Sequence, residues 1–248
     1  LIQDSDQVFV MGHKNPDMDS IGASVGVRKM AELNNLDGYI VVNFDELNGS
    51  VSRLVDEIEQ KAVFYDSFIS PEEALSKMTA KSLVVIVDTH KPSMVVDERL
   101  LKRVEKVVVI DHHRRGEEFI NSPTLVYMEP YASSTAELVT ELLEYQPKTK
   151  KLSMLEATAL LSGIIVDTKS FTLRTGARTF EAASYLRTHG ADTILIQRFL
   201  KEDIDTYIAR SKIIQSVDFV RPGIAVATGE QIIYDSVLIA QTADILLT

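Results

Sequence analysis

The sequence contains no cysteine among its 248 residues. That absence excludes disulfide bonds, iron–sulfur clusters, zinc sites with cysteine ligands and thiol nucleophiles, and it fits a reducing cytoplasm. Long apolar runs are missing as well, because "LVVIVD" and "GIIVD" fall far short of the ~20 residues that a membrane-spanning helix needs. We therefore expect a chain that does not itself span a membrane.

Basic residues are outnumbered, with 26 lysines and arginines against 36 aspartates and glutamates and a formal net charge of −10. A chain with this balance repels nucleic acid and anionic membranes unless it forms a local positive site. We therefore expect no double-stranded nucleic acid among its partners.

The two ends of the sequence lack the signals that usually begin and end a protein. The chain opens with "LIQDSDQ", which has neither the charged region nor the apolar region of a signal peptide. It closes with "SVLIAQTADILLT", a helical pattern without a glycine or proline terminator. We expect this chain to be a fragment of a longer protein.

Strand and helix patterns alternate over the first two-thirds of the chain, which predicts an α/β fold with a mostly parallel sheet and helices on both faces. The expected strands are 7–12, 38–43, 82–88 and 106–111. The expected helices are 19–35, 52–61, 70–79, 133–145 and one from the capping box of Ser153 and Glu156 to about residue 166. We expect Ser20 to cap the first helix. Residues 191–217 read as one long helical stretch, followed by a strand at 223–229 and a second, smaller unit.

Acidic residues and histidines follow three of the expected strands. In an open α/β sheet the carboxyl ends of the strands lie side by side and bind ligands, and one more aspartate, Asp167, ends the apolar run "SGIIV". Clustered carboxylates repel one another unless a cation neutralises them. Oxygen and imidazole ligands without sulfur suit Mn²⁺ or Mg²⁺, with Fe²⁺ and Co²⁺ as alternatives. The residues at the strand ends are His13, Asp17, Asp19, Asp88, Asp111, His112 and His113.

Four motifs in this order resemble those of the DHH phosphoesterases: "GHKNPDMDS", the aspartate of "VIVDTH", "VIDHH" and "GIIVDT". The resemblance covers residues 8 to about 190. It implies two manganese ions bridged by Asp88, the first of them held by His13, Asp17 and Asp88. The ligands of the second ion would be Asp19, Asp88, His112 and Asp167. The resemblance also implies that His113 faces the substrate and that Asp111 supports the histidines from behind.

The chemistry of such a site agrees with phosphoester hydrolysis. Two ions roughly 3.5–4 Å apart clamp a phosphoryl group and activate a water as hydroxide for in-line attack. Asp88, Asp111 and His113 are then the expected catalytic residues. The side chain of His113, nearby arginines or lysines and the ions would stabilise the charge of the transition state.

Further candidates lie near these motifs. Arg174 and Arg178 in "SFTLRTGARTF" are candidate phosphate contacts, although a solvated surface role fits them equally well. The hydroxyl residues that open the helix near residue 133 are expected to cap it first and to contact phosphate second. They are Ser133, Ser134 and Thr135. We expect His90 to be an exposed loop histidine and His189 to end a helix.

Within the family the sequence is most similar to those of the membrane-anchored GdpP-type phosphodiesterases of Gram-positive bacteria, which hydrolyse cyclic di-AMP to linear pApA. That likeness implies a cytoplasmic catalytic piece whose parent lies at the cell membrane, with membrane helices, a PAS-like domain and a degenerate GGDEF domain upstream. It implies a cyclic dinucleotide as substrate, and a homodimer is compatible with it.

The same resemblance divides the chain into a DHH catalytic domain at 1–190, a linker helix at 191–210 and the first part of a DHH-associated substrate-binding domain at 211–248. The Gly-rich GGGH segment that normally contacts the nucleotide is not found in the sequence. Its absence puts substrate affinity and specificity in doubt and leaves the metal chemistry untouched.

Other functions remain open. A manganese-dependent family II inorganic pyrophosphatase shares the first motif, but its Ser-Arg-Lys-Lys-Gln motif is not found here. An exopolyphosphatase or a short-oligonucleotide phosphodiesterase of the same superfamily would use the same ligands. A nucleotide sensor without activity is disfavoured because all six ligand positions are filled. A purely structural role would leave the clustered carboxylates unexplained.

Overall fold

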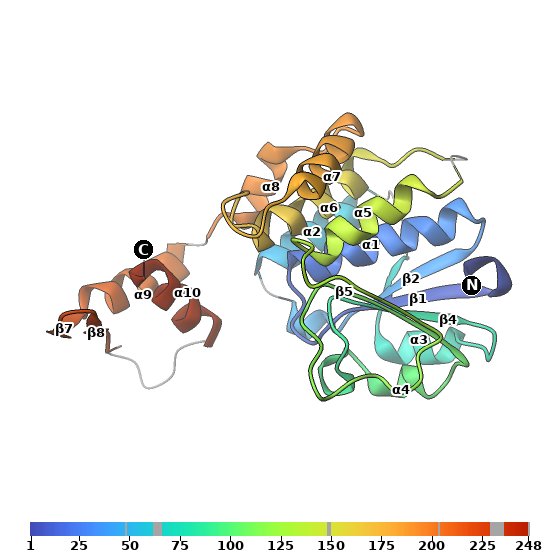
Figure 1. The fold of residues 1–248 in the computed structure, drawn as a ribbon, viewed down its shortest axis with the longest axis horizontal. Coiled ribbons are helices and arrows are strands. Elements are labelled where there is room, and N and C mark those ends of the chain that lie inside the picture. The colour runs from blue at the N-terminus through green and yellow to red at the C-terminus, as the bar shows by residue number, and fades with distance from the viewer. Residues whose placement is uncertain (48, 62–65, 148–149, 203, 229–235, 248) are drawn as a thin grey trace. The chain divides into compact units, whose positions relative to one another are not determined.

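The computed structural model describes residues 1–47, 49–61, 66–147, 150–202, 204–228 and 236–247. The chain divides into two compact units, Leu1–Phe199 and Leu200–Thr248 (Figure 1). No helix in the described ranges is both long and apolar enough to cross a membrane.

The first unit is built on a six-stranded sheet in the order β3-β2-β1-β4-β5-β6, in which every pair of neighbours is parallel. The chain first fills the sheet outward from β1 to β3 and then returns to β4, so the order reverses between β1 and β4. Such a reversal leaves a crevice at the carboxyl ends of the two strands. The strands are β1 (Gln7–Met11), β2 (Asp37–Val41), β3 (Phe68–Ile69), β4 (Leu83–Val87), β5 (Lys106–Asp111) and β6 (Leu125–Met128).

Helices cover both faces of this sheet, as predicted. On one face, alternate strand residues such as Phe9, Met11 and Ile86 pack in one core with Ala74 and Leu100. These two residues belong to the short helices α3 (Pro71–Lys77) and α4 (Glu98–Leu101). On the other face α1 (Met18–Leu33) contacts β1, β2 and β4, and α5 (Thr135–Glu144) contacts β5. Figure 1 shows α1 and α5 on the side of the sheet opposite α3 and α4.

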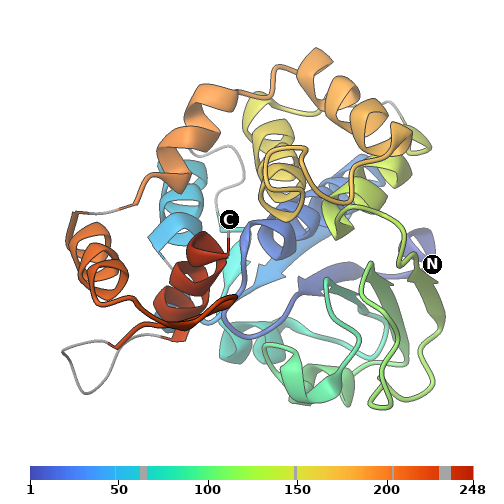
Figure 2. The same ribbon diagram turned by 60° about the vertical axis from the view of Figure 1, so that its left-hand side comes forward.

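A second layer of helices packs on α1. The helix α6 (Met154–Asp167) crosses α1 at close range, because Gly22 and Gly163 lie at the contact. A Cβ on Gly22 would lie 2.5 Å from the carbonyl oxygen of Ala159, and one on Gly163 would lie 2.8 Å from the Cα of Asp19. The capping box predicted for α6 is present in full. The remaining helices of this unit are α2 (Gly49–Gln60), α7 (Ala177–Thr188) and α8 (Thr193–Leu200). Figure 2 shows α6 and α7 beyond α1, away from the sheet.

Two local expectations are wrong. Asp17, and not Ser20, caps α1, because the helix begins at Met18 and the Asp17 carboxylate accepts bonds from the backbone of Asp19 and Ser20. The helical stretch expected over 191–217 is two helices, α8 and α9 (Ile204–Gln215). The guanidinium of Arg53 donates to the carbonyl oxygen of Phe199 at 2.9 and 2.6 Å, which satisfies a carbonyl at the end of α8.

The second unit contains α9, the antiparallel strands β7 (Asp218–Arg221) and β8 (Ile224–Val226), and α10 (Ser236–Leu246). The strand expected at 223–229 corresponds to β8. Residues 229–235, part of the segment expected to open the smaller unit, lie outside the described residues. The assignment of 1–190, 191–210 and 211–248 to catalytic domain, linker and substrate domain stays a prediction.

Candidate metal centre

Three central strands bring the candidate ligands together at the point where the strand order reverses. His13 follows β1, Asp88 follows β4 directly, and Asp111 and His112 lie where β5 ends. Because β1, β4 and β5 are neighbours in the sheet, their carboxyl ends form one continuous edge. The structure therefore confirms that the acidic strand ends meet, as the sequence predicted.

The turn after β1 positions Asp17 and Asp19. Asn15 has a φ of 52°, a left-handed conformation that asparagine tolerates better than most residues. The turn ends at Asp17, whose Oδ1 accepts hydrogen bonds from the backbone N–H of Asp19 at 2.9 Å and of Ser20 at 3.0 Å. Asp17 is thus helix cap and candidate ligand at once, and Asp19 follows in the first turn of α1.

Asp88 lies between two groups of candidate ligands. Its Oδ2 is 3.4 Å from Nε2 of His13, whereas its Oδ1 is 3.5 Å from Nε2 of His112. The hydroxyl of Thr135 donates to the same Oδ1 at 3.2 Å. Asp88 has a φ of 60°, and a left-handed residue other than glycine often marks a functional site. The two oxygens of one carboxylate therefore face two different sets of side chains.

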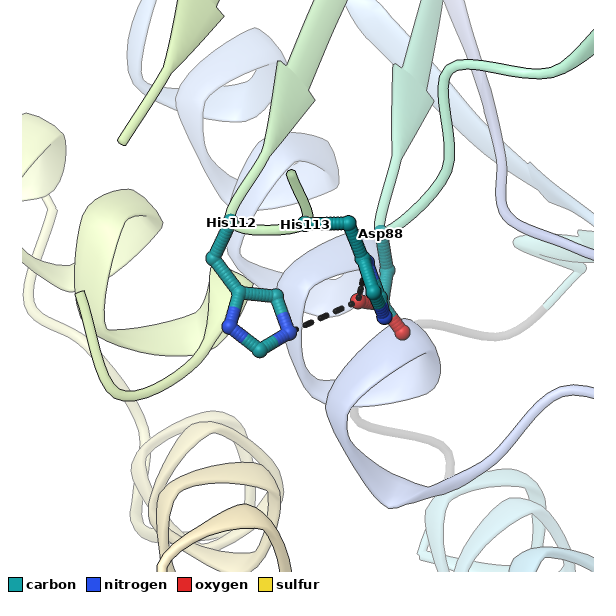
Figure 3. A group of neighbouring side chains, drawn as sticks. All are labelled: Asp88, His112 and His113. Carbon is teal, nitrogen blue, oxygen red and sulfur yellow. Dashed lines mark ion pairs between the residues drawn. The ribbon is translucent and has the colours of Figure 1, made fainter. Parts of the chain in front are cut away.

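The ligand atoms form three overlapping groups in which every atom lies within 4.8 Å of the others. Nε2 of His112 is 3.2 Å from Oδ2 of Asp167 and 3.9 Å from Oδ2 of Asp19. Figure 3 shows His112 and His113 converging on Asp88 from the end of β5. The groups are His13 with Asp17 and Asp88, Asp19 with His112 and Asp167, and Asp88 with His112 and His113. This donor set of carboxylates and imidazoles without sulfur fits a divalent cation such as Mn²⁺.

The N-terminus of α5 holds the carboxylate of Asp19. The backbone N–H of Thr135 donates to Oδ2 at 2.7 Å, and that of Ala136 donates to Oδ1 at 2.8 Å. Asp19 is fully buried, and the positive end of a helix dipole favours its negative charge. The sequence analysis expected the start of this helix to be capped by its hydroxyl residues first and to contact phosphate second, and it did not predict the bond to Asp19.

Ser133 and Ser134 are buried at the same helix end. The hydroxyl of Ser133 donates to Oε2 of Glu137, and the hydroxyl oxygen of Ser134 accepts from the backbone N–H of Glu137 at 3.0 Å. Ser134 therefore caps α5, as expected. A contact between either serine and a phosphate stays a prediction.

The position of His90 differs from the expectation of the sequence analysis. It was expected to be exposed, but its exposed fraction is 2%, and its Nδ1 lies 2.6 Å from Oδ2 of Asp111. The backbone N–H of Gly116 donates to Nε2 of His90 at 3.1 Å, so neutral His90 carries its proton on Nδ1 and donates it to Asp111. The other oxygen of Asp111 faces Nδ1 of His113 at 2.8 Å. The carboxylate of Asp111 thus joins His90 and His113, whereas the sequence analysis expected it to support His112 and His113. The supporting role of Asp111 stays a prediction.

Crowding of buried carboxylates raises their pKa values. Burial and the negative charge of Asp17 raise the pKa of Asp19 to about 7, and burial with the charges of Asp19 and Asp17 raises that of Asp167 to about 9. Burial and the same neighbours raise the pKa of Asp88 well above its usual value. Burial and the charge of His113 lower the pKa of His112 to about 4, which favours the neutral form that binds metals. A divalent cation would relieve this repulsion.

A cavity of about 940 Å³ lies beside the ligand groups. His112 and His113, at the end of β5, help to line it. Arg114 and Arg174 line it, and among the described residues around it none is acidic. Arg178 does not line it. Its guanidinium binds Glu141 through two bonds of 2.7 Å, and a phosphate would compete with that pair. The role of Arg178 as a substrate contact stays a prediction.

A parallel α/β sheet with carboxylate and imidazole side chains at its switch point is suited to binding a divalent cation. The chain belongs to the DHH family, because the sequence model of the DHH family, N-terminal domain, matches residues 7–164. This match confirms the resemblance seen in the four motifs. DHH phosphoesterases are metal-dependent, and the Asp and His cluster described above is compatible with that property.

Two named relatives are similar in sequence to this chain over its whole length. It is 59% identical over 251 residues to the cyclic-di-AMP phosphodiesterase GdpP of Bacillus subtilis and 57% identical over 249 residues to the cyclic-di-AMP phosphodiesterase PdeA of Listeria monocytogenes. Each alignment covers 100% of this chain and 38% of the relative, so the chain spans less than half the length of those proteins. An exopolyphosphatase-related protein from Bacteroides fragilis shares the fold with a TM-score of 0.72 and 17% identity, over 88% of this chain and 63% of its own.

The carboxylate cluster should make the stability of the metal-free protein depend on pH, and a bound cation should offset this dependence. The unfolded chain ionises Asp19 and Asp167 near the ordinary pKa of 3.8, whereas the folded, metal-free chain holds their protons up to about 7 and about 9. The free energy of unfolding of the metal-free protein should therefore fall as pH rises through this window. A cation binds the ionised carboxylates and should recover this loss.

We expect the rise in Tm on adding Mn²⁺ to be larger at about pH 8 than at about pH 5. Scanning calorimetry with and without a chelator measures it. Asp37→Asn, which changes an exposed aspartate at the start of β2, is the control and should show the same pH dependence as the wild type. A rise in Tm that is equal at both pH values would contradict this account.

Proposed function

We propose that this chain is the catalytic part of a metal-dependent phosphodiesterase that hydrolyses cyclic di-AMP to linear pApA. The observation that carries hydrolysis is the carboxylate of Asp88, whose two oxygens face two ligand groups at the switch point of the sheet. The choice of substrate is supported by 57–59% identity, over the full chain, to proteins named cyclic-di-AMP phosphodiesterases.

The residues present suit two Mn²⁺ ions, with Mg²⁺, Fe²⁺ and Co²⁺ as alternatives. Asp88 would contribute one carboxylate oxygen to each ion, with His13 and Asp17 on the side of its Oδ2. The ligands on the side of Oδ1 would be Asp19, His112 and Asp167. Two ions held by these residues would polarise a phosphoryl group and would lower the pKa of a water molecule.

The protein's own groups would then position the phosphate and receive its charge. His113 lines the cavity, and its hydrogen bond to Asp111 raises the pKa of its imidazole, which favours the charged form. Because Nδ1 of His113 faces Asp111, Nε2 is the atom that can donate to a phosphoryl oxygen. Arg174 lines the same cavity and adds a second positive charge. Asp111, held by His90 on its other oxygen, orients His113.

Several broader features complete the proposal. A catalytic domain at 1–190, a linker at 191–210 and the beginning of a substrate-binding domain at 211–248 would form part of a longer protein. That protein would be anchored at the cell membrane with this chain in the cytoplasm, and it could act as a homodimer. These features are supported by the family resemblance alone.

A comparison of substrates tests the proposal. The Mn²⁺-loaded protein is incubated separately with cyclic di-AMP, pApA and pyrophosphate, and the products are separated by chromatography. We expect pApA to be released from cyclic di-AMP faster than phosphate is released from pyrophosphate. Hydrolysis of pyrophosphate alone would contradict the proposal and favour a pyrophosphatase.

His90 should act as a positioning residue through Asp111. Replacement of His90 by alanine removes the hydrogen bond that fixes Asp111, so His113 loses its orientation while the candidate metal ligands remain. We expect kcat to fall by about tenfold, the lower end of the effect of such supporting residues, with little change in KM. The variant should still bind Mn²⁺.

Two further variants separate positioning from a general loss of structure. His90→Asn keeps a donor near the place of Nδ1 and should recover part of kcat, whereas His189→Ala, at the end of α7, should leave kcat unchanged. An unaltered kcat in His90→Ala, measured by steady-state kinetics, would show that His90 has no such role.

A further inference from the structure

Aromatic side chains line the cavity beside the candidate metal centre. Tyr131 precedes the start of α5, Phe171 lies between α6 and α7, and Phe180 lies in the first turns of α7. All three belong to the same unit and to the same cavity as His113 and Arg174. None of these rings has a part in binding metal or in orienting His113.

Two of the rings are already stacked on each other. The ring centroids of Phe171 and Phe180 are 5.6 Å apart with an angle of 19° between their planes. Phe180 nevertheless has an exposed fraction of 57%, and Tyr131 one of 94%. Single exposed rings are common, but apolar rings that gather on one surface mark a binding site more often, because their burial by a ligand is favourable.

The loop between α6 and α7 fixes the position of Phe171. Lys169, Ser170 and Phe171 all have positive φ values, between 45° and 65°. Thr168 holds this turn: its hydroxyl oxygen accepts from the backbone N–H of Phe171 at 2.9 Å, and its carbonyl oxygen accepts from that of Leu173 at 2.8 Å. The loop begins directly after Asp167, so the aromatic pair is tied to a candidate metal ligand by a few residues of ordered backbone.

The charges around the cavity indicate which kind of ligand would cover the rings. Arg114, Arg174 and His113 line it, and among its described neighbours no acidic side chain takes part. The lining is therefore positive in a chain with a net charge of −10, and the carboxylates of the candidate metal centre lie directly behind His112 and His113. A ligand that satisfies both features carries a phosphate next to a flat ring, and a nucleotide has that chemistry. Nucleobases stack on exposed aromatic side chains in many proteins that bind single-stranded nucleic acid.

We propose that an adenine base of the substrate stacks on the pair formed by Phe171 and Phe180, with Tyr131 as a second aromatic wall of the same cavity. This inference rests on the proposed function, because it assigns a base to the phosphodiester that the metal centre would hydrolyse. The aromatic pair would make the site prefer a nucleotide over a phosphoester without a ring, such as pyrophosphate. Arg174 and His113 would contact the phosphate that joins the base to the metal centre.

The first test compares steady-state kinetics of Phe180→Ala and of the wild type on cyclic di-AMP with Mn²⁺. We expect KM to rise by about tenfold, because a base-stacking contact is lost, while kcat and Mn²⁺ binding change little. Phe180→Tyr keeps the ring and should restore KM. Tyr145→Ala removes an exposed ring at the far end of α5 and should match the wild type. An unchanged KM in Phe180→Ala, with the fold intact by circular dichroism, would overturn the inference.

The second test detects stacking directly and does not depend on reaction rates. A linear dinucleotide with 2-aminopurine in place of adenine is titrated with the Mn²⁺-loaded protein, and its fluorescence is recorded. We expect strong quenching with the wild type and with Phe180→Tyr, and weak quenching with Phe180→Ala and Tyr131→Ala. Equal quenching by all four proteins would show that the rings serve only to pack the loop.

The two tests also keep this inference apart from the proposed function. If the wild type does not hydrolyse cyclic di-AMP, the proposed function fails, and the fluorescence titration still decides whether the rings stack a base. If the wild type does hydrolyse it and Phe180→Ala behaves like the wild type in both tests, only the stacking inference fails.

Discussion

Mutual repulsion among buried carboxylates is the constraint on which the first unit depends. Asp19, Asp88 and Asp167 approach one another at the edge where the strand order reverses, and burial raises the pKa of each of them. A parallel sheet can bring these groups together because its strand ends lie side by side. The fold must then supply groups that stabilise negative charge. It does so with hydrogen-bond donors in fixed positions and not with flexible surface lysines.

The helices around the sheet provide part of this compensation as hydrogen-bond donors. The N-terminus of α5 directs two backbone N–H groups at Asp19, and Thr135 adds a hydroxyl to Asp88. The helix α6 delivers Asp167 to the same place, which requires it to pass within contact distance of α1. Glycine at positions 22 and 163 permits that approach, because a Cβ on either would overlap neighbouring atoms. The close packing of α6 on α1 and the position of Asp167 among the candidate ligands therefore depend on the same two glycines.

The alternation of strands and helices, the four central strands of the parallel sheet and the residues at their ends could be predicted from the sequence, because each follows from local patterns of a few residues. The strands β3 and β6 at the two edges of the sheet and the helix α7 were not predicted. The burial of His90 could not be predicted, since it depends on Asp111 and Gly116, which are more than twenty residues away. The pairing of Arg178 with Glu141 depends on how α7 packs against α5. Features that need a tertiary partner leave no trace in local composition.

The central claim is the proposal that Asp88 would bridge two ions, and the variant Asp88→Asn tests it most directly. Asparagine tolerates the left-handed backbone at this position and keeps the size of the side chain, so the fold should survive while the bridging charge is lost. Electron paramagnetic resonance of the Mn²⁺-loaded protein, with metal analysis of the same samples, measures the outcome. The account predicts a spin-coupled pair of ions in the wild type and the loss of both coupling and tight binding in the variant. Two ions retained with unchanged coupling in Asp88→Asn would contradict it.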